Sequence, residues 1–212
     1  MEENESILSK LSSQMGDSTQ QSNENAALMC KESPGLLEQI AEGLGHKDLR
    51  LAGDCAEVMT KVAETHPRFV TPYAEQLLSA INHKNTRVRW ESMHAVAFLS
   101  PLIPGRIIAA LDIIQERMFT DSSTLVRDYS IQCLGNAASC GEEEARKILP
   151  ILKKGLMELG DKYLSKLLSA MIGIAKVSPD LAVEVLMYGY DYANHPISSV
   201  QKAAKKLVKA AQ

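Results

Sequence analysis

A short pattern that recurs at a nearly constant interval is the feature of this sequence that most constrains its fold. Within residues 86–99, TRVRWESMHAVAFL, small and apolar residues fall on one helix face: Val88, Ser92, Ala95, Val96 and Leu99. Related stretches are anchored 39, 38, 38 and 36 residues apart, at Leu49, Val88, Val126, Leu164 and Val200. A period near 38 residues, built of helix pairs, predicts a solenoid with one continuous core.

The regular alternation of turns and apolar helix faces divides the chain into an N-terminal segment and a series of repeats. From Pro34 onward it predicts five helix pairs, at about residues 34–66, 67–103, 104–140, 141–178 and 179–212. Residues 1–33 depart from this rhythm, because a polar run, GDSTQQSNEN, separates two apolar pieces. We interpret them as irregular capping helices, since a terminal repeat needs a polar outer face. The alternative is a partly disordered tail that ends near Asn25.

The composition favours a folded chain and disfavours a phosphate-binding one. Hydrophobic residues make up 45% and charged residues 23%, while the formal net charge is −3. An acidic balance argues against a nucleic-acid partner, which usually requires a basic excess. The charge is nevertheless uneven, because residues 145–212 hold five acids against eleven bases. Either this polarity orients a partner or it only keeps the surface hydrated.

No motif for catalysis, a cofactor or a metal stands out. The four cysteines form no CxxC pair, and the five histidines fall at separate turns or helices, so we expect no metal site and no cofactor. The acidic N-terminus and the lack of 18 uninterrupted apolar residues predict neither a signal peptide nor a membrane span. We therefore expect a non-enzymatic, cytoplasmic protein.

Proline, arginine and small residues at repeated places carry a resemblance to a known family. The pattern consists of a first helix bent by proline, a turn that contains Asp, a second helix that starts with Val-Arg, and small residues beyond that start. It resembles the HEAT repeat, of the HEAT/armadillo class. The residues concerned are Pro72, Val88, Arg89, Ala95, Asp121, Val126, Arg127, Cys133, Leu49, Arg50 and Ala56. The resemblance covers about residues 34–212 and weakens in the last two repeats, where Ser165 and Gln201 replace the arginine.

The resemblance implies an all-α, right-handed α-solenoid, or superhelix, of about five HEAT-like helix pairs with an irregular N-terminal cap. It also implies a scaffold that binds macromolecules along a curved face. In this family the repeated arginines bond to turn acids, which assigns Arg50, Arg89 and Arg127 to a structural ladder with Asp121. The ladder is incomplete, because His83 stands where Arg89 would need an acid.

The second helices line the concave side in this family, and a column of side chains can be assigned to it. Positions two, six and nine after each anchor point away from the core, and five of them are candidate partner-binding residues: Trp90, His94, Asp128, Gln132 and Lys166. Trp90 is either a binding anchor or packs between second helices, against Leu51 or Tyr129. Further along, Lys202, Lys205, Lys206 and Lys209 form either a solvated cap or a patch for an acidic partner or nucleic acid.

Three functions compete. The leading one is a non-catalytic scaffold that binds a protein or peptide on its concave face. The alternative is a DNA-repair enzyme, because one group of alkylpurine DNA glycosylases is built from HEAT-like repeats and uses tryptophans, a catalytic Asp and a basic concave face. The third is self-assembly through an apolar first-repeat surface near Leu51 and Val58. The sequence predicts neither the identity of the partner nor the oligomeric state.

Overall fold

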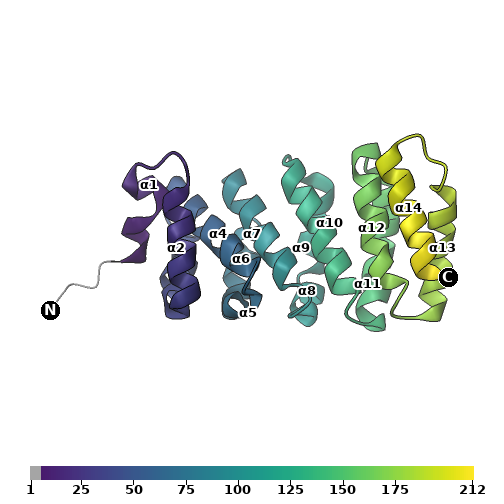
Figure 1. Cartoon of the computed structure of the whole chain (residues 1–212), viewed down its shortest axis with the longest axis horizontal. Coiled ribbons are helices and arrows are strands. Elements are labelled where there is room, and N and C mark those ends of the chain that lie inside the picture. Colours follow the sequence, from purple (N-terminus) through teal and green to yellow (C-terminus); the bar gives the residue numbers. More distant parts are fainter. Residues whose placement is uncertain (1–5) are drawn as a thin grey trace. The chain divides into compact units, whose positions relative to one another are not determined.

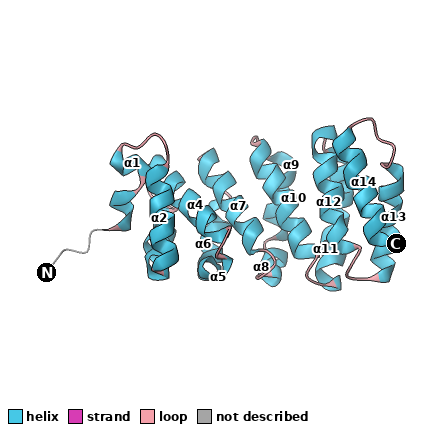
Figure 2. Cartoon of the chain, in the orientation of Figure 1, coloured by secondary structure: helices cyan, strands magenta, loops and turns pink. Residues whose placement is uncertain are grey.

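A computed structural model describes residues 6–212, and every regular element in this range is a helix (Figures 1 and 2). The chain forms two compact units, Met1–Leu102 and Ile103–Gln212. The first five residues of the predicted N-terminal cap lie outside the described residues. Within the described range, no helix has the length and apolar character needed to cross a membrane.

The first unit begins with short elements that pack on the first helix pair. These elements are η1 (Ile7–Lys10), α1 (Ser12–Met15) and α2 (Gln21–Glu32), and the helix that α1 and α2 contact is α4 (Leu49–Ala63). Gly16 and Gln20, with φ of 68° and 66°, turn the chain between α1 and α2. The described part of residues 1–33 therefore folds against α4.

This packing corrects one expectation. Leu51 and Val58, which we placed on an exposed apolar surface, are 5% and 0% exposed. Both belong to α4, which packs against α1, α2 and α7 (Thr86–Leu99). An apolar face of this kind is unavailable for self-assembly in the folded unit.

The two helix pairs of the first unit have interrupted first helices and continuous second helices. The remaining elements of this unit are η2 (Pro34–Leu36), α3 (Leu37–Gly43), α5 (Pro67–Val70), η3 (Thr71–Tyr73) and α6 (Ala74–Ala80). The break between α5 and α6 contains Pro72, whose missing N–H and ring disfavour a continuous helix. The second helices, α4 and α7, pack against each other.

The second unit also consists of helix pairs, but among its first helices only the α8–α9 pair is interrupted. Its elements are α8 (Pro104–Ala109), α9 (Leu111–Thr120), α10 (Thr124–Ala138), α11 (Glu142–Glu158), η4 (Asp161–Tyr163), α12 (Leu164–Ile174), α13 (Pro179–Asp191) and α14 (Ser198–Ala211). The second helices pack in sequence, α10 on α12 and α12 on α14 (Figure 1). Unlike Pro72, Pro150 lies within a continuous helix, α11.

Equivalent turns start the second helices. The side chains of Asp48 and Asn85 accept hydrogen bonds from backbone N–H groups of the first turns of α4 and α7. A histidine two residues earlier closes each turn, because its Nδ1 accepts the backbone N–H of the capping residue, at 3.0 Å from His46 and 3.1 Å from His83. His195 accepts the N–H of Ile197 in the same way, at 3.2 Å. These three histidines are therefore turn residues.

The packing face predicted for residues 86–99 is confirmed. All five of its residues are fully buried: Val88, Ser92, Ala95, Val96 and Leu99. The corresponding residues of α10 are also fully buried, namely Val126, Ser130 and Cys133. Outside this face Met93 and Ala97 are also fully buried, whereas Trp90 and His94 are half-buried.

Candidate functional site

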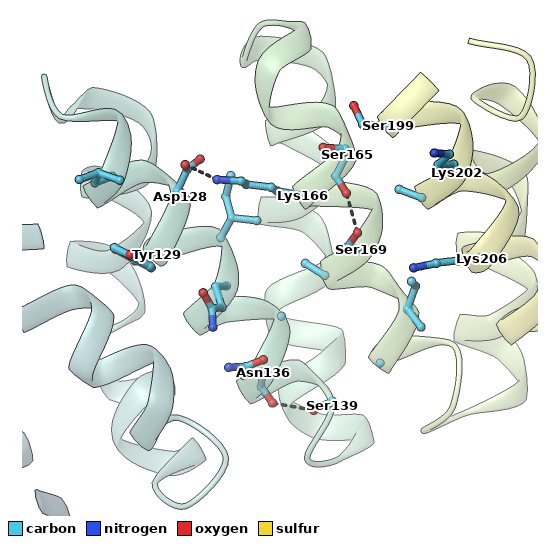
Figure 3. A pocket seen from close by; sticks show the side chains of 18 residues that line it. Asp128, Tyr129, Asn136, Ser139, Ser165, Lys166, Ser169, Ser199, Lys202 and Lys206 are labelled. Atoms are coloured by element: carbon cyan, nitrogen blue, oxygen red, sulfur yellow. Dashed lines mark hydrogen bonds and ion pairs between the residues drawn. The ribbon is translucent and has the colours of Figure 1, made fainter. Parts of the chain in front are cut away.

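An open pocket lies in the second unit, across three consecutive second helices. We call it the second-helix groove, and its volume is about 750 Å³. Its polar and charged lining comes from α10, α12 and α14: Asp128, Gln132, Asn136, Ser139, Ser165, Lys166, Ser169, Ser199, Lys202 and Lys206 (Figure 3). Its apolar and small lining is Leu125, Tyr129, Ile131, Gly135, Ala170, Ile172, Gly173 and Ala203. One surface thus combines apolar contacts with a few charged groups.

Two glycines bring α10 and α12 close together beneath the groove. A Cβ atom on Gly135 would lie 2.6 Å from Cβ and 2.8 Å from Cα of Ala170. A Cβ atom on Gly173 would lie 2.5 Å from Cβ of Ser139. Side chains larger than hydrogen would push the helices apart, so the glycines set the floor of the groove.

An ion pair crosses the groove from one helix to the next. Nζ of Lys166, on α12, contacts Oδ2 of Asp128, on α10 (Figure 3). The Asp128 side chain is 21% exposed and that of Lys166 is 47% exposed, so solvent reaches both partners. An exposed pair of this kind contributes little to stability and remains able to exchange partners.

Two lysines line the other side of the groove. Lys202 and Lys206 lie on consecutive turns of α14, and Figure 3 shows the Lys206 side chain extending toward α12. Both residues are exposed. Helix α14 contains no acidic residue that could pair with them at i,i+4.

The structure therefore brings three of the five predicted partner-binding residues into one groove: Asp128, Gln132 and Lys166. The other two, Trp90 and His94, belong to α7 in the first unit, where both are half-buried. The ring of His94 lies beside that of Phe98 in a tilted arrangement, with centroids 4.7 Å apart. Burial lowers the pKa of His94 below its ordinary value, although the Glu64 carboxylate acts in the opposite direction.

Two of the three arginines assigned to a ladder, Arg89 and Arg127, donate side-chain hydrogen bonds to backbone carbonyls of the turns. Arg89 donates from Nη1 to the carbonyls of His83 and Lys84, at 3.0 and 3.1 Å. Arg127 donates from Nε to the carbonyl of Asp121, at 2.6 Å. Arg50 is exposed, and its backbone N–H donates to the Asp48 side chain.

Sequence reasoning missed a buried ionic cluster in the first unit. Arg87 Nη1 lies 2.9 Å from Oδ1 of Asp54, and its Nη2 lies 2.5 Å from Oε2 of Glu57. Nδ2 of Asn23 donates to the same two carboxylates, at 2.9 Å each, and the N–H of Ser13 donates to Asp54 at 2.7 Å. The signal that could have found this cluster is a pair of acids, Asp54 and Glu57, within an otherwise apolar and small-residue helix.

Burial and hydrogen bonding change two carboxyl pKa values in and beside this cluster. Burial opposes ionisation of Asp54, but hydrogen bonds from Ser13 and Asn23 together with the Arg87 charge leave its pKa lowered. Burial raises the pKa of Glu91 to about 7, and the neighbouring Glu57 adds to this shift. Within residues 6–212, no three His, Cys, Asp or Glu side chains are arranged to hold a metal ion.

Comparison with known proteins shows the fold. No family model matches the sequence, and no curated protein matches it. A designed armadillo repeat protein in complex with the peptide (KR)4 is similar, with a TM-score of 0.75, 16% identity, and coverage of 97% of this chain and 98% of that one. An engineered protein is similar with a TM-score of 0.74 at 16% identity, covering 100% and 97% of the two chains.

A third similar structure is that of computationally designed armadillo repeat proteins for modular peptide recognition. Its TM-score is 0.68 at 16% identity, with coverage of 96% of this chain and 98% of that chain. Matches of this extent confirm the predicted all-α helical-repeat fold of armadillo/HEAT type. At 16% identity these matches show the fold alone.

Proposed function

We propose that this armadillo/HEAT-like repeat chain is a non-catalytic scaffold that binds a protein or peptide partner on its second helices, at the second-helix groove. The observation that carries the proposal is the joint contribution of α10, α12 and α14 to one open surface. Each helix supplies the residues that face away from its own packing face, so partner contacts need not disturb the core.

The dimensions of the groove suit an extended chain segment. Packed helices lie roughly 8–10 Å apart, so the path from α10 to α14 spans roughly 16–20 Å. An extended chain advances about 3.3 Å per residue, and about five or six residues would cross this path. Extended segments are one of the recurring forms in which proteins recognise peptides.

The lining offers both kinds of contact that an extended segment needs. The side-chain amides of Gln132 and Asn136 can donate and accept hydrogen bonds, as a peptide backbone requires. Ile172, Ala203 and Leu125 provide apolar contact beside them. The similarity to designed armadillo repeat proteins, one of them in complex with a peptide, supports the same use of the fold.

Trp90 and His94 are proposed as a separate contact point on α7 of the first unit. A half-buried tryptophan offers apolar area and an indole N–H at low cost in conformational entropy, which suits a binding anchor.

A groove-filling variant tests the proposal. Ser169 is exposed and lines the groove, so Ser169→Trp should fill it without entering the core. Met157, on α11, is 79% exposed and does not line the groove, so Met157→Trp is the matched control. Peptides selected from a random display library on the parent chain should bind Ser169→Trp at least about tenfold more weakly and Met157→Trp equally well. Equal binding to Ser169→Trp would show that the groove is not the binding surface.

A further inference from the structure

We infer that the second-helix groove binds an acidic polypeptide segment, with carboxylates placed against Lys202 and Lys206. This inference rests on the proposed function and names the chemistry of the partner. The groove carries three lysines and one aspartate, a net charge of +2, in a chain whose formal net charge is −3. The charge of the groove therefore has the opposite sign to that of the chain.

Lys202 and Lys206 have no carboxylate partner among the described residues, unlike three lysines of the first helices of the same unit. Lys147, Lys153 and Lys154 are paired with Glu143, Glu184 and Glu158. Neither Lys202 nor Lys206 takes part in an ion pair with any described residue. Their ammonium groups are therefore available to a carboxylate supplied by another chain.

Asp128 provides an example of a carboxylate that contacts a lysine of this groove. It comes from α10 and meets the amine of Lys166 within the groove. A ligand carboxylate approaching Lys166 would compete with Asp128, and Asp128 would also repel it. Asp128 therefore acts as an internal competitor, and its removal should strengthen binding of an acidic segment.

The spacing of the two free amines favours acids at alternate positions. Residues i and i+4 on a helix have Cβ atoms about 5–6 Å apart, which applies to Lys202 and Lys206. Alternate residues of an extended chain lie about 6.6 Å apart on one face. The intervening residues would face the opposite way, so they can be small.

The experiment measures fluorescence anisotropy of labelled octapeptides with the full chain. The acidic probe is (Glu-Ala)4 and the basic probe is (Lys-Ala)4. The double variant K202Q/K206Q should weaken (Glu-Ala)4 binding by roughly 2- to 30-fold, the range expected for two exposed ion pairs. K205Q/K209Q removes the same charge from the same helix at residues outside the groove lining, and should change binding by less than about twofold. Asp128→Asn should strengthen binding by about two- to fivefold.

Several outcomes would overturn the inference. Equal weakening by K202Q/K206Q and K205Q/K209Q would indicate general charge attraction without a site in the groove. Tighter binding of (Lys-Ala)4 than of (Glu-Ala)4 would also contradict the inference. So would a duplex DNA oligonucleotide that binds more strongly than (Glu-Ala)4 and that both double variants weaken alike. No binding of (Glu-Ala)4, alongside display-selected peptides that Ser169→Trp excludes, would overturn the acidic partner and leave the proposed function intact.

Discussion

Arg87 on α7 places its Nη2 atom 2.5 Å from Oε2 of Glu57 on α4, so an ion pair joins the second helices of consecutive repeats. The Glu57 side chain is 6% exposed, and that of Asp54, the second partner of Arg87, is 2% exposed. The Arg87 guanidinium group, whose side chain is 29% exposed, therefore pairs with two buried carboxylates, and Nζ of Lys61 lies 3.4 Å from Oε1 of the same Glu57. Hydrogen bonds from Asn23 to both carboxylates extend this connection to α2.

Removing the guanidinium group should destabilise the first unit strongly. Arg87→Met leaves the buried Asp54 without the Arg87 charge while Glu57 keeps its pair with Lys61, so the expected loss is about 3 kcal/mol in the free energy of unfolding. Urea denaturation followed by circular dichroism measures it. Arg50→Met, at an exposed arginine of the preceding second helix, should change stability by no more than about 0.5 kcal/mol. Similar losses for the two variants would contradict a central role for Arg87.

Glu91 should give stability a specific pH dependence. Its pKa of about 7 lies above the ordinary 4.5, so the folded state holds the proton more tightly than the unfolded state. The unfolding free energy contributed by this group therefore falls as pH rises from about 4.5 to 7, and the loss is complete above pH 7. Glu91→Gln, which mimics the neutral acid, should be more stable than the parent by up to about 3 kcal/mol at pH 8.

The same two proteins should have nearly equal stability at pH 4, because Glu91 is then largely protonated in both the folded and the unfolded state. Urea unfolding at both pH values compares the difference between the two proteins, so titrations elsewhere in the chain cancel. A difference independent of pH would mean that Glu91 is ionised throughout this range.

Equivalent serines on α7 and α10 should respond oppositely to substitution. Both Ser92 and Ser130 are fully buried, but the Ser130 hydroxyl donates to the Val126 carbonyl at 2.8 Å, whereas Ser92 Oγ has no partner among the described residues. Ser130→Ala should cost about 1 kcal/mol of unfolding free energy, while Ser92→Ala should be neutral or stabilising by up to about 1 kcal/mol. Thermal unfolding of the two single variants measures this. An equal loss in both would show that Ser92 is also hydrogen-bonded.

The close contact between α10 and α12 beneath the second-helix groove predicts that adding a single methyl group lowers the free energy of unfolding. Gly135→Ala places a Cβ atom against Cβ and Cα of Ala170, and overpacking of this kind should cost about 1–3 kcal/mol. Gly105→Ala, in α8 with no neighbour within 4 Å, should be neutral or stabilising by up to about 1 kcal/mol. Denaturant midpoints of both variants test the contrast. Equal effects would mean that α10 and α12 can separate without cost.

Trp90 provides a direct test of a binding anchor on α7. If the proposed contact point is used, Trp90→Ala should weaken an identified partner by about tenfold or more while the melting temperature changes little. Calorimetric titration with that partner, alongside thermal unfolding of the free chain, separates these effects. Unchanged binding combined with a large fall in melting temperature would assign Trp90 to packing only.

Local periodicity accounts for the part of the fold that could be predicted from sequence. Buried residues such as Val88 and Val126 recur at helical spacing within their own helices, and the turn histidines His46 and His83 match one another, so no distant contact is needed to recognise them. The same periodicity places Asp128 on the side of α10 that lines the groove. Its use in binding stays a prediction.

Contacts between distant segments account for what could not be predicted. The burial of Leu51 and Val58 depends on the elements packed around α4, α1 and α2 among them, and no pattern within α4 reveals that. The charges of Asp54 and Arg87 lie 33 positions apart, so their pairing follows only from the packing of α4 on α7. The alignment of repeats predicted a structural role for Arg50, which is exposed, and predicted none for Arg87.

The contact of Gly135 with Ala170 also determines which residues of this groove can be substituted without a change in helix spacing. Because backbone atoms and a methyl group determine how closely α10 approaches α12, exchange of Gln132, Lys166 or Lys206 does not alter helix spacing. The residues proposed to contact a partner could thus be replaced one at a time without changing how α10 packs on α12. Changes in specificity would then require no compensating substitutions in the core, whereas the glycine should tolerate almost none.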